Sequence, residues 1–238
     1  MTSSSRAGFA RRLFAALSAV LAVGTAGGAA VAAELAAERA PRSDAWQGTL
    51  GLRAMFIRDA GLDPFATQDA FPQLSLGLLR EVTRSEKLSV FGGVGWDIGT
   101  SDASARGVQT HLTLNHPSVV VELRHRPIER LYLFVRVAPG LLHAAASLDD
   151  SSSPGPLQTS FNSLAVDGSG GVGFRVNGAR DVVGAWVRLE GGYGWTSSHD
   201  MSFKPGLGGA DASKAGGLAL SPLAARGAFL RAALAISY

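Results

Sequence analysis

The residues of this chain that could do chemistry are sparse and of few kinds. Cysteine is absent, which excludes disulfides, Cys-ligated zinc, thiol nucleophiles and iron–sulfur clusters. One local arrangement has the types needed for nucleophilic hydrolysis, a histidine and a serine two positions apart with an acid downstream. These residues are His116 and Ser118, separated by Pro117, with Glu122 or Glu129 as the acid. A proline between base and nucleophile bends the chain, so we expect His116 to be a polar strand residue and the protein not to be an enzyme.

Metal ligation has no better basis in the sequence. The five histidines show no metal-ligand spacing: His111, His116, His125, His143 and His199. Acidic residues gather in segments rich in turn-forming residues, but their spacing matches no defined calcium loop: Asp59, Asp63, Asp69, Asp149 and Asp150. We therefore expect solvated aspartates, no metal site and no cofactor.

A third set of ionisable residues falls mid-segment on the polar side of alternating apolar and polar stretches. It comprises five arginines and three acids: Arg53, Asp97, Arg136, Asp167, Arg175, Arg188, Glu190 and Arg231. Buried charges must pair or meet water, because an unpaired buried charge is costly. If the segments enclose an interior, these residues predict a set of ion pairs that fills it, with a polar path for small anions as the alternative.

The elements that would position these side chains have the sequence pattern of long strands. Alternation with period two over more than ten residues predicts a strand, and these segments exceed the length of an average globular strand. Eight are predicted: Trp46–Ile57, Gln73–Val82, Lys87–Gly99, Val108–Arg126, Arg130–Ala146, Leu164–Val176, Ala185–Trp195 and Pro222–Tyr238. Short connections are Arg84–Glu86, Pro127–Glu129 and Asn177–Arg180; longer ones are Arg58–Ala70, Thr100–Arg106, Leu148–Ser160 and Ser197–Ser221. Alternating short turns and long loops predict an all-β fold, an eight-stranded antiparallel up-and-down transmembrane β-barrel.

Two of these segments are ambiguous. In Val108–Arg126 the apolar residues change from even to odd positions at His116-Pro117, so we interpret it as one strand with a bulge there. The competing interpretation makes Asn115–Ser118 a hairpin turn between two strands. Pro222–Tyr238 is alanine-rich and also fits a helix by its leucine spacing.

A water-soluble barrel is the alternative to a membrane barrel. It would turn its apolar face inward and scatter lysine and glutamate over the outside. The three lysines, Lys87, Lys204 and Lys214, all lie outside the strand centres. Aromatic residues near strand ends suit the interfacial girdles of a membrane barrel: Trp46, Phe56, Trp96, Tyr193, Trp195 and Tyr238. The pattern favours an apolar face toward lipid and a polar interior.

The first 44 residues carry an export signal rather than part of the barrel. A segment with three arginines precedes an apolar run, and small residues end at an Ala-x-Ala site, which is the pattern of a secretory signal peptide. We predict a signal peptide over 1–32, a short polar leader over 33–44 and the barrel over 45–238. Beyond this signal the remaining basic residues equal the 19 acidic ones in number, so we expect no nucleic-acid partner.

From Asp44 to Tyr238 the chain resembles the small outer-membrane β-barrels of Gram-negative bacteria, the OmpA-type membrane domain and the OmpW-like proteins. The most specific likeness is at the C-terminus, where Arg231, Ala233, Ile236 and Tyr238 occupy the places of the family's assembly signal, with Ala233 replacing the usual glycine. The resemblance implies recognition of the last strand by the barrel-assembly machinery. The lipid A deacylases are also similar barrels with a His-x-Ser pair, which His116 and Ser118 match only locally.

These observations predict a monomeric outer-membrane protein in contact with outer-membrane lipid. The leading hypothesis is a structural or surface-interaction barrel with an ion-paired, largely closed interior and outward loops that bind a surface ligand. A narrow, porin-like channel for small solutes is the alternative, and a lipid-modifying enzyme is a third.

Overall fold

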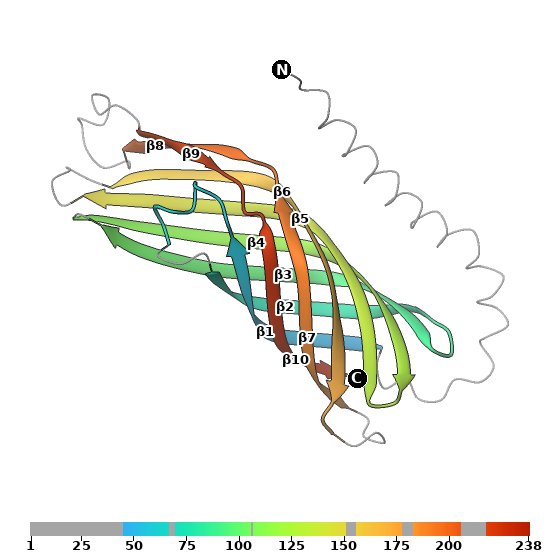
Figure 1. Ribbon diagram of the computed structural model, residues 1–238. Coiled ribbons are helices and arrows are strands. Elements are labelled where there is room, and N and C mark those ends of the chain that lie inside the picture. Colours follow the sequence, from blue (N-terminus) through green and yellow to red (C-terminus); the bar gives the residue numbers. More distant parts are fainter. Residues whose placement is uncertain (1–44, 67–69, 106, 151–155, 178–182, 206–217) are drawn as a thin grey trace, which may run out of the picture. The chain divides into compact units, whose positions relative to one another are not determined.

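A computed structural model describes residues 45–66, 70–105, 107–150, 156–177, 183–205 and 218–238 (Figure 1). The signal peptide predicted over 1–32 and the leader predicted over 33–44 lie outside the described residues.

Eight of the ten strands close into a ring, which confirms the predicted fold (Figure 1). Neighbouring strands pair antiparallel in the order β1, β2, β3, β4, β5, β6, β7 and β10, and β10 returns to β1 from Gln47↔Ser237 to Ile57↔Gly227. The strands are β1 (Trp46–Ile57), β2 (Ala70–Arg84), β3 (Leu88–Ala105), β4 (Val108–Ile128), β5 (Leu131–Asp150), β6 (Leu157–Arg175), β7 (Gly184–Thr196), β8 (His199–Pro205), β9 (Leu218–Leu223) and β10 (Gly227–Ser237). Pairing around the ring is continuous through its middle, whereas β3 beyond Ile98 and β6 before Ala165 extend past one of their ring neighbours.

The two faces of the ring are reversed relative to those of a water-soluble barrel, with apolar side chains pointing outward and charged side chains pointing inward. On β1, the side chains of Leu50 and Leu52 are 55% and 70% exposed, whereas Arg53 between the strand's apolar positions is 2% exposed. The same alternation places Val94, Val119 and other large apolar residues outside on the other strands. A closed ring with an apolar exterior and an ionic interior satisfies its backbone within the barrel and can face lipid, so this is a transmembrane β-barrel of the outer-membrane type.

No helix that could span a bilayer occurs in the described part of the chain.

The ring strands are longer than predicted at the end with the long connections. β3 and β4 remain paired up to Ala105↔Val108, and Gly107 has a φ of 85° in the tight turn between them. The segment Thr100–Arg106 is therefore mostly strand, and the prediction of a long loop there was wrong. β5 and β6 likewise pair up to Leu148↔Leu157, inside the predicted loop Leu148–Ser160. In outer-membrane barrels the longer connections are those that face the cell exterior.

The connection predicted over Ser197–Ser221 contains two further strands. β8 pairs with the end of β6 through Leu157↔Pro205 and with β9 through Phe203↔Leu218. Ring strand β10 begins at Gly227 rather than at Pro222, which belongs to β9. The helical alternative for this segment is wrong, because β1 and β7 both pair with β10 along its length.

β4 is one continuous strand, but the predicted bulge at His116-Pro117 is absent. The pairing with β3 keeps one register from Leu88↔His125 to Ala105↔Val108, so even-numbered residues face inward throughout. Leu112 and Leu114 face inward and are buried among the apolar side chains of the upper interior. The apparent change of face therefore reflects a change of surroundings along the barrel axis and not an extra residue.

Candidate functional site

An apolar cap closes the interior at the extended end. The segment after β1 folds inward, and Leu62 and Phe65 are buried there among apolar side chains of the ring and of β8. The cap includes Met55, Ile57, Phe71, Leu112, Leu114, Leu142, Phe161, Met201, Phe203, Leu223 and Phe229. Buried aromatic and aliphatic side chains of this number exclude water from the mouth of the barrel.

Hydrogen bonds hold the inward-folded segment in place. The Asp59 carboxylate accepts from the amide of Gly61 at 2.9 Å, which forms a tight turn. The Thr110 hydroxyl donates to the carbonyl of Pro64 at 2.6 Å, and the Ser101 hydroxyl donates to the carbonyl of Phe65 at 2.8 Å. The segment predicted as an outward loop, Arg58–Ala70, is thus partly a plug, and its residues 67–69 lie outside the described residues.

An ionic layer lies beneath the cap, centred on Arg53. One guanidinium nitrogen of Arg53, Nη1, lies 2.7 Å from a carboxylate oxygen of Asp97 on β3 and 2.7 Å from one of Asp167 on β6. Its plane also lies over the ring of Phe229, at 4.0 Å from the ring centroid. A single residue of β1 therefore links two carboxylates across the barrel.

The layer continues through Arg231 on β10. This arginine donates to Asp97 at 2.8 Å and to Glu190 on β7 at 2.8 Å. Glu190 also accepts from the hydroxyl of Ser169 at 2.7 Å and lies 3.9 Å from Arg136 on β5. Three arginines thus face three carboxylates, and the formal charges of the layer cancel.

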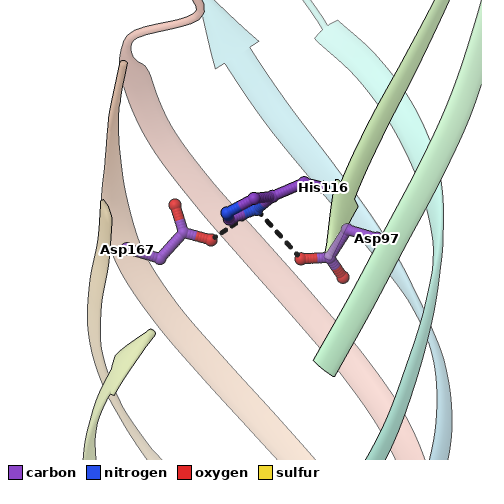
Figure 2. Close-up of side chains that lie close together, drawn as sticks. All are labelled: Asp97, His116 and Asp167. Carbon is purple, nitrogen blue, oxygen red and sulfur yellow. Dashed lines mark ion pairs between the residues drawn. The ribbon is translucent and has the colours of Figure 1, made fainter. Parts of the chain in front are cut away.

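His116 also lies at this level, beside Asp97 and Asp167. Figure 2 shows its ring between Asp97 and Asp167, with Nδ1 at 3.9 Å and 3.6 Å from the nearest oxygen of each. These three residues form the one group in the described chain whose ligand atoms lie close enough to hold a metal ion. Arg53 already places a cationic nitrogen at 2.7 Å from both carboxylates, so a divalent ion would add uncompensated charge beside it. The group does not fit a metal.

A second buried ionic cluster lies nearer the end with the short turns. Glu122 accepts from Arg124 at 2.6 Å and from Arg188 at 2.6 Å. Both arginines also donate to the side-chain oxygen of Gln47, at 2.5 Å and 3.0 Å. The four side chains are buried and come from three strands, β1, β4 and β7.

Aromatic rings surround this lower cluster. Arg124 lies over the ring of Phe91 at 3.6 Å, and Arg188 lies over that of Phe134 at 4.3 Å. Tyr132 and Trp186 pack edge to face at 4.9 Å. Stacked guanidinium groups and aromatic rings fill the cross-section here and leave the arginines in contact with π-faces instead of water.

The structure places all eight of the predicted ions inside the barrel, and each is at most 8% exposed. It separates them into three places: Arg53, Asp97, Arg136, Asp167, Glu190 and Arg231 in the ionic layer, Arg188 in the lower cluster, and Arg175 beside Asn177 near a short turn. The residues of the predicted assembly signal divide by face, with Arg231 inside and both Ile236 and Tyr238 outside, while Ala233 is partly buried.

Two further buried ions, Glu122 and Arg124, were not assigned to the barrel interior from the sequence. The assumed bulge made the faces of β4 uncertain at the segment where they lie. Their even positions, opposite the outward Val119, Val121 and Leu123, would have identified them once one register was kept.

The hydrolytic arrangement considered around His116 is not assembled. His116 and Ser118 both face the interior, and the Ser118 hydroxyl donates to the carbonyl of Gly95 at 3.4 Å. Glu122 is held by two arginines, and Glu129 is exposed in the turn between β4 and β5. Of the other histidines, His143 contacts Asn162 at 2.9 Å and His199 stacks on Phe161.

No protein-family model and no curated protein matches the sequence. Among solved structures, the chain is similar to Ail, the attachment invasion locus protein of Yersinia pestis, in complex with the heparin analogue sucrose octasulfate, at 10% identity and a TM-score of 0.47, covering 80% of this chain and 97% of that one. It is also similar to the outer membrane protease OmpT of Escherichia coli, at 7% identity and a TM-score of 0.48, covering 84% and 99%. Neisserial surface protein A matches at 12% identity and a TM-score of 0.43, covering 82% and 97%. Likeness at these levels assigns neither an activity nor a ligand to the chain.

Proposed function

We propose that the protein is a closed outer-membrane barrel that serves as a structural anchor and presents its extended strands and connections at the cell surface. The observation that supports this most strongly is the double closure of the interior, an apolar cap directly above a charge-neutral ionic layer. A path for solutes would have to disrupt buried ion pairs and a packed apolar core together. A single small barrel is the architecture expected of an OmpA-type or OmpW-like protein. The last strand carries the residues that we expect the barrel-assembly machinery to recognise.

The extended end supports the surface-presentation part of the proposal. The outward apolar residues of the ring, such as Val94, Trp96, Val119 and Val121, form an apolar belt. Above this belt, the outward side chains of β3 to β6 change to polar residues such as Ser104, Gln109 and Asn162. An outward polar face combined with an inward apolar core is the pattern of a sheet in water. This part of the barrel therefore stands clear of the hydrocarbon and is available to ligands outside the cell.

Labelling of single cysteines on intact cells tests this arrangement, because the natural chain has none. We expect an impermeant maleimide to label Ser104→Cys and Ser202→Cys, which lie on the exposed face of the extended end. Lys87→Cys, in a short turn at the other end, should react only after the cells are opened. Labelling of Lys87→Cys alone on intact cells would reverse the orientation and overturn surface presentation by this end.

A further inference from the structure

We propose that the outer wall of the barrel carries a hydrolytic site formed by Asp102, His111 and Thr113, which cleaves carboxylic esters of amphiphiles in the adjacent leaflet. The site lies on the outward face of β3 and β4 and does not involve the interior. It goes beyond the anchor function and differs from the expectation that the protein is not an enzyme.

Two hydrogen bonds place the three side chains in the order that hydrolysis requires. Asp102 lies directly opposite His111 in the pairing of β3 with β4, and its Oδ1 is 2.6 Å from Nδ1 of the imidazole. The other ring nitrogen, Nε2, is 3.1 Å from the hydroxyl oxygen of Thr113, two residues along β4. An acid that orients a base, and a base in contact with a hydroxyl, are the recognised components of an activated oxygen nucleophile.

The site is accessible and lies just beyond the apolar belt. The side chains of Asp102 and His111 are 76% and 47% exposed, so a substrate can reach the ring. On the same face of β4, Asn115 pairs with Ile98, and Pro117 pairs with the exposed Trp96 of the belt.

At about 3.3 Å per residue, Thr113 stands roughly 13 Å along the strand from Pro117, which the barrel tilt reduces further along the membrane normal. This is the interfacial depth of a bilayer, between hydrocarbon and water. An amphiphile with its chain against the belt would therefore place a carbonyl near Thr113.

A hollow next to His111 suits the polar part of such a substrate. It measures about 340 Å³ and is lined by Asp102, Ser104, Gln109, His111, Ser147 and Asp149, together with Ala103 and Thr110. Two carboxylates and several hydroxyl and amide groups favour an uncharged or cationic head that bears hydroxyl groups. An anionic head would meet Asp102 and Asp149 and bind less well.

The reaction balances without a further reagent. The Thr113 hydroxyl oxygen attacks the ester carbonyl while His111 Nε2 takes its proton, and Asp102 stabilises the resulting imidazolium. The bond to the alcohol then breaks, and His111 returns the proton to the departing alkoxide, which leaves an acyl-threonine. Water, deprotonated by His111, attacks this ester and releases the fatty acid and free Thr113.

Hydrolysis of p-nitrophenyl octanoate by the folded full chain in nonionic micelles tests the site. We expect Thr113→Val and His111→Gln each to lower the rate by roughly 10²- to 10⁴-fold, whereas Thr113→Ser retains activity. The matched controls are Thr83→Val and His125→Gln, an exposed threonine on β2 and an exposed histidine at the far end of β4 that lie away from the triad; both should keep the natural rate. The change in gel mobility on boiling shows that each variant is folded.

Acid quenching during turnover, followed by mass spectrometry, should place the octanoyl group on the peptide that contains Thr113. The proposal is overturned if the natural chain is no faster than Thr113→Val, or if the acyl group resides on another residue. It is equally overturned if Thr83→Val abolishes the rate as completely as Thr113→Val, because the hydroxyl of Thr113 would then have no special role.

Discussion

Removal of Arg53 is the perturbation that most sharply tests the ionic layer. In Arg53→Met, Asp97 and Asp167 both lose the guanidinium that they share, but the two carboxylates retain different ion-pair partners. Asp97 keeps Arg231 at 2.8 Å, whereas Asp167 keeps only the imidazole of His116 at 3.6 Å among the ion-pair partners found in the described residues. Asp167 is therefore left as a buried charge without a strong counter-ion.

The expected loss of folding stability follows from the unpaired charge of Asp167. Breaking a buried ion pair by removing one partner costs about 3–5 kcal/mol, because the other charge stays buried. Adding Asp167→Asn removes the stranded charge, so the double variant should be more stable than Arg53→Met alone. We expect a coupling energy between the two residues of about 2–3 kcal/mol, near the upper end of the range for contacting residues.

Urea unfolding of the barrel in lipid vesicles, followed by tryptophan fluorescence, measures these differences. Arg80→Met is the matched control: Arg80 is an exposed arginine on the outer wall that lies over Trp46 at 5.3 Å, and its loss should cost less than about 1 kcal/mol. A loss in Arg53→Met no larger than in Arg80→Met would refute the reasoning. The reasoning would also be refuted if the loss of stability in the double variant equalled the sum of the losses in Arg53→Met and Asp167→Asn, because the two residues would then not be coupled.

Three further predictions concern packing and the lower cluster. A Cβ atom at Gly173 would overlap the ring of Tyr132, so Gly173→Val should lower the free energy of unfolding by about 1–3 kcal/mol, whereas Gly168→Ala, with no atom within 4 Å of the new methyl, should be neutral in the same urea titration. Phe65→Ala empties a fully buried position in the cap and should cost about 3–5 kcal/mol, seen as a lower temperature for the change in gel mobility; an unchanged temperature would show that the segment does not pack as described. Glu122→Gln removes the counter-ion of two arginines and should cost about 3–5 kcal/mol by urea unfolding, and a stabilised variant would contradict the lower cluster.

The ring could be predicted from the sequence because a lipid-facing strand shows its two faces directly. In β1, β3, β6 and β7 the apolar and polar positions alternate through the belt, and the strands lie where the pattern indicated. Beyond the belt the same alternation has the opposite meaning. Leu112 and Leu114 are apolar because they face inward under the cap, whereas Val119 and Val121 are apolar because they face lipid. Period-two patterning alone cannot distinguish these cases, which is why a bulge was inferred.

The ion pairs required information that the sequence does not hold. Which charges meet depends on the stagger of strands across the barrel, and Arg53 and Asp167 lie 114 positions apart. The composition of the interior could be predicted residue by residue, but its division into an ionic layer and a lower cluster could not. The contact of His111 with Asp102 depends on the long β3–β4 hairpin, which was predicted as a loop.

The central claim is that the folded barrel is closed, and planar-bilayer conductance of residues 33–238 measures this most directly. Protein shown to be folded by its gel mobility should give no discrete steps above the bilayer background. Because both closures contribute, the double variant Phe65→Ala and Arg136→Ala should begin to conduct if it remains folded. Reproducible steps from the natural chain would contradict the account and establish a channel in place of a closed anchor.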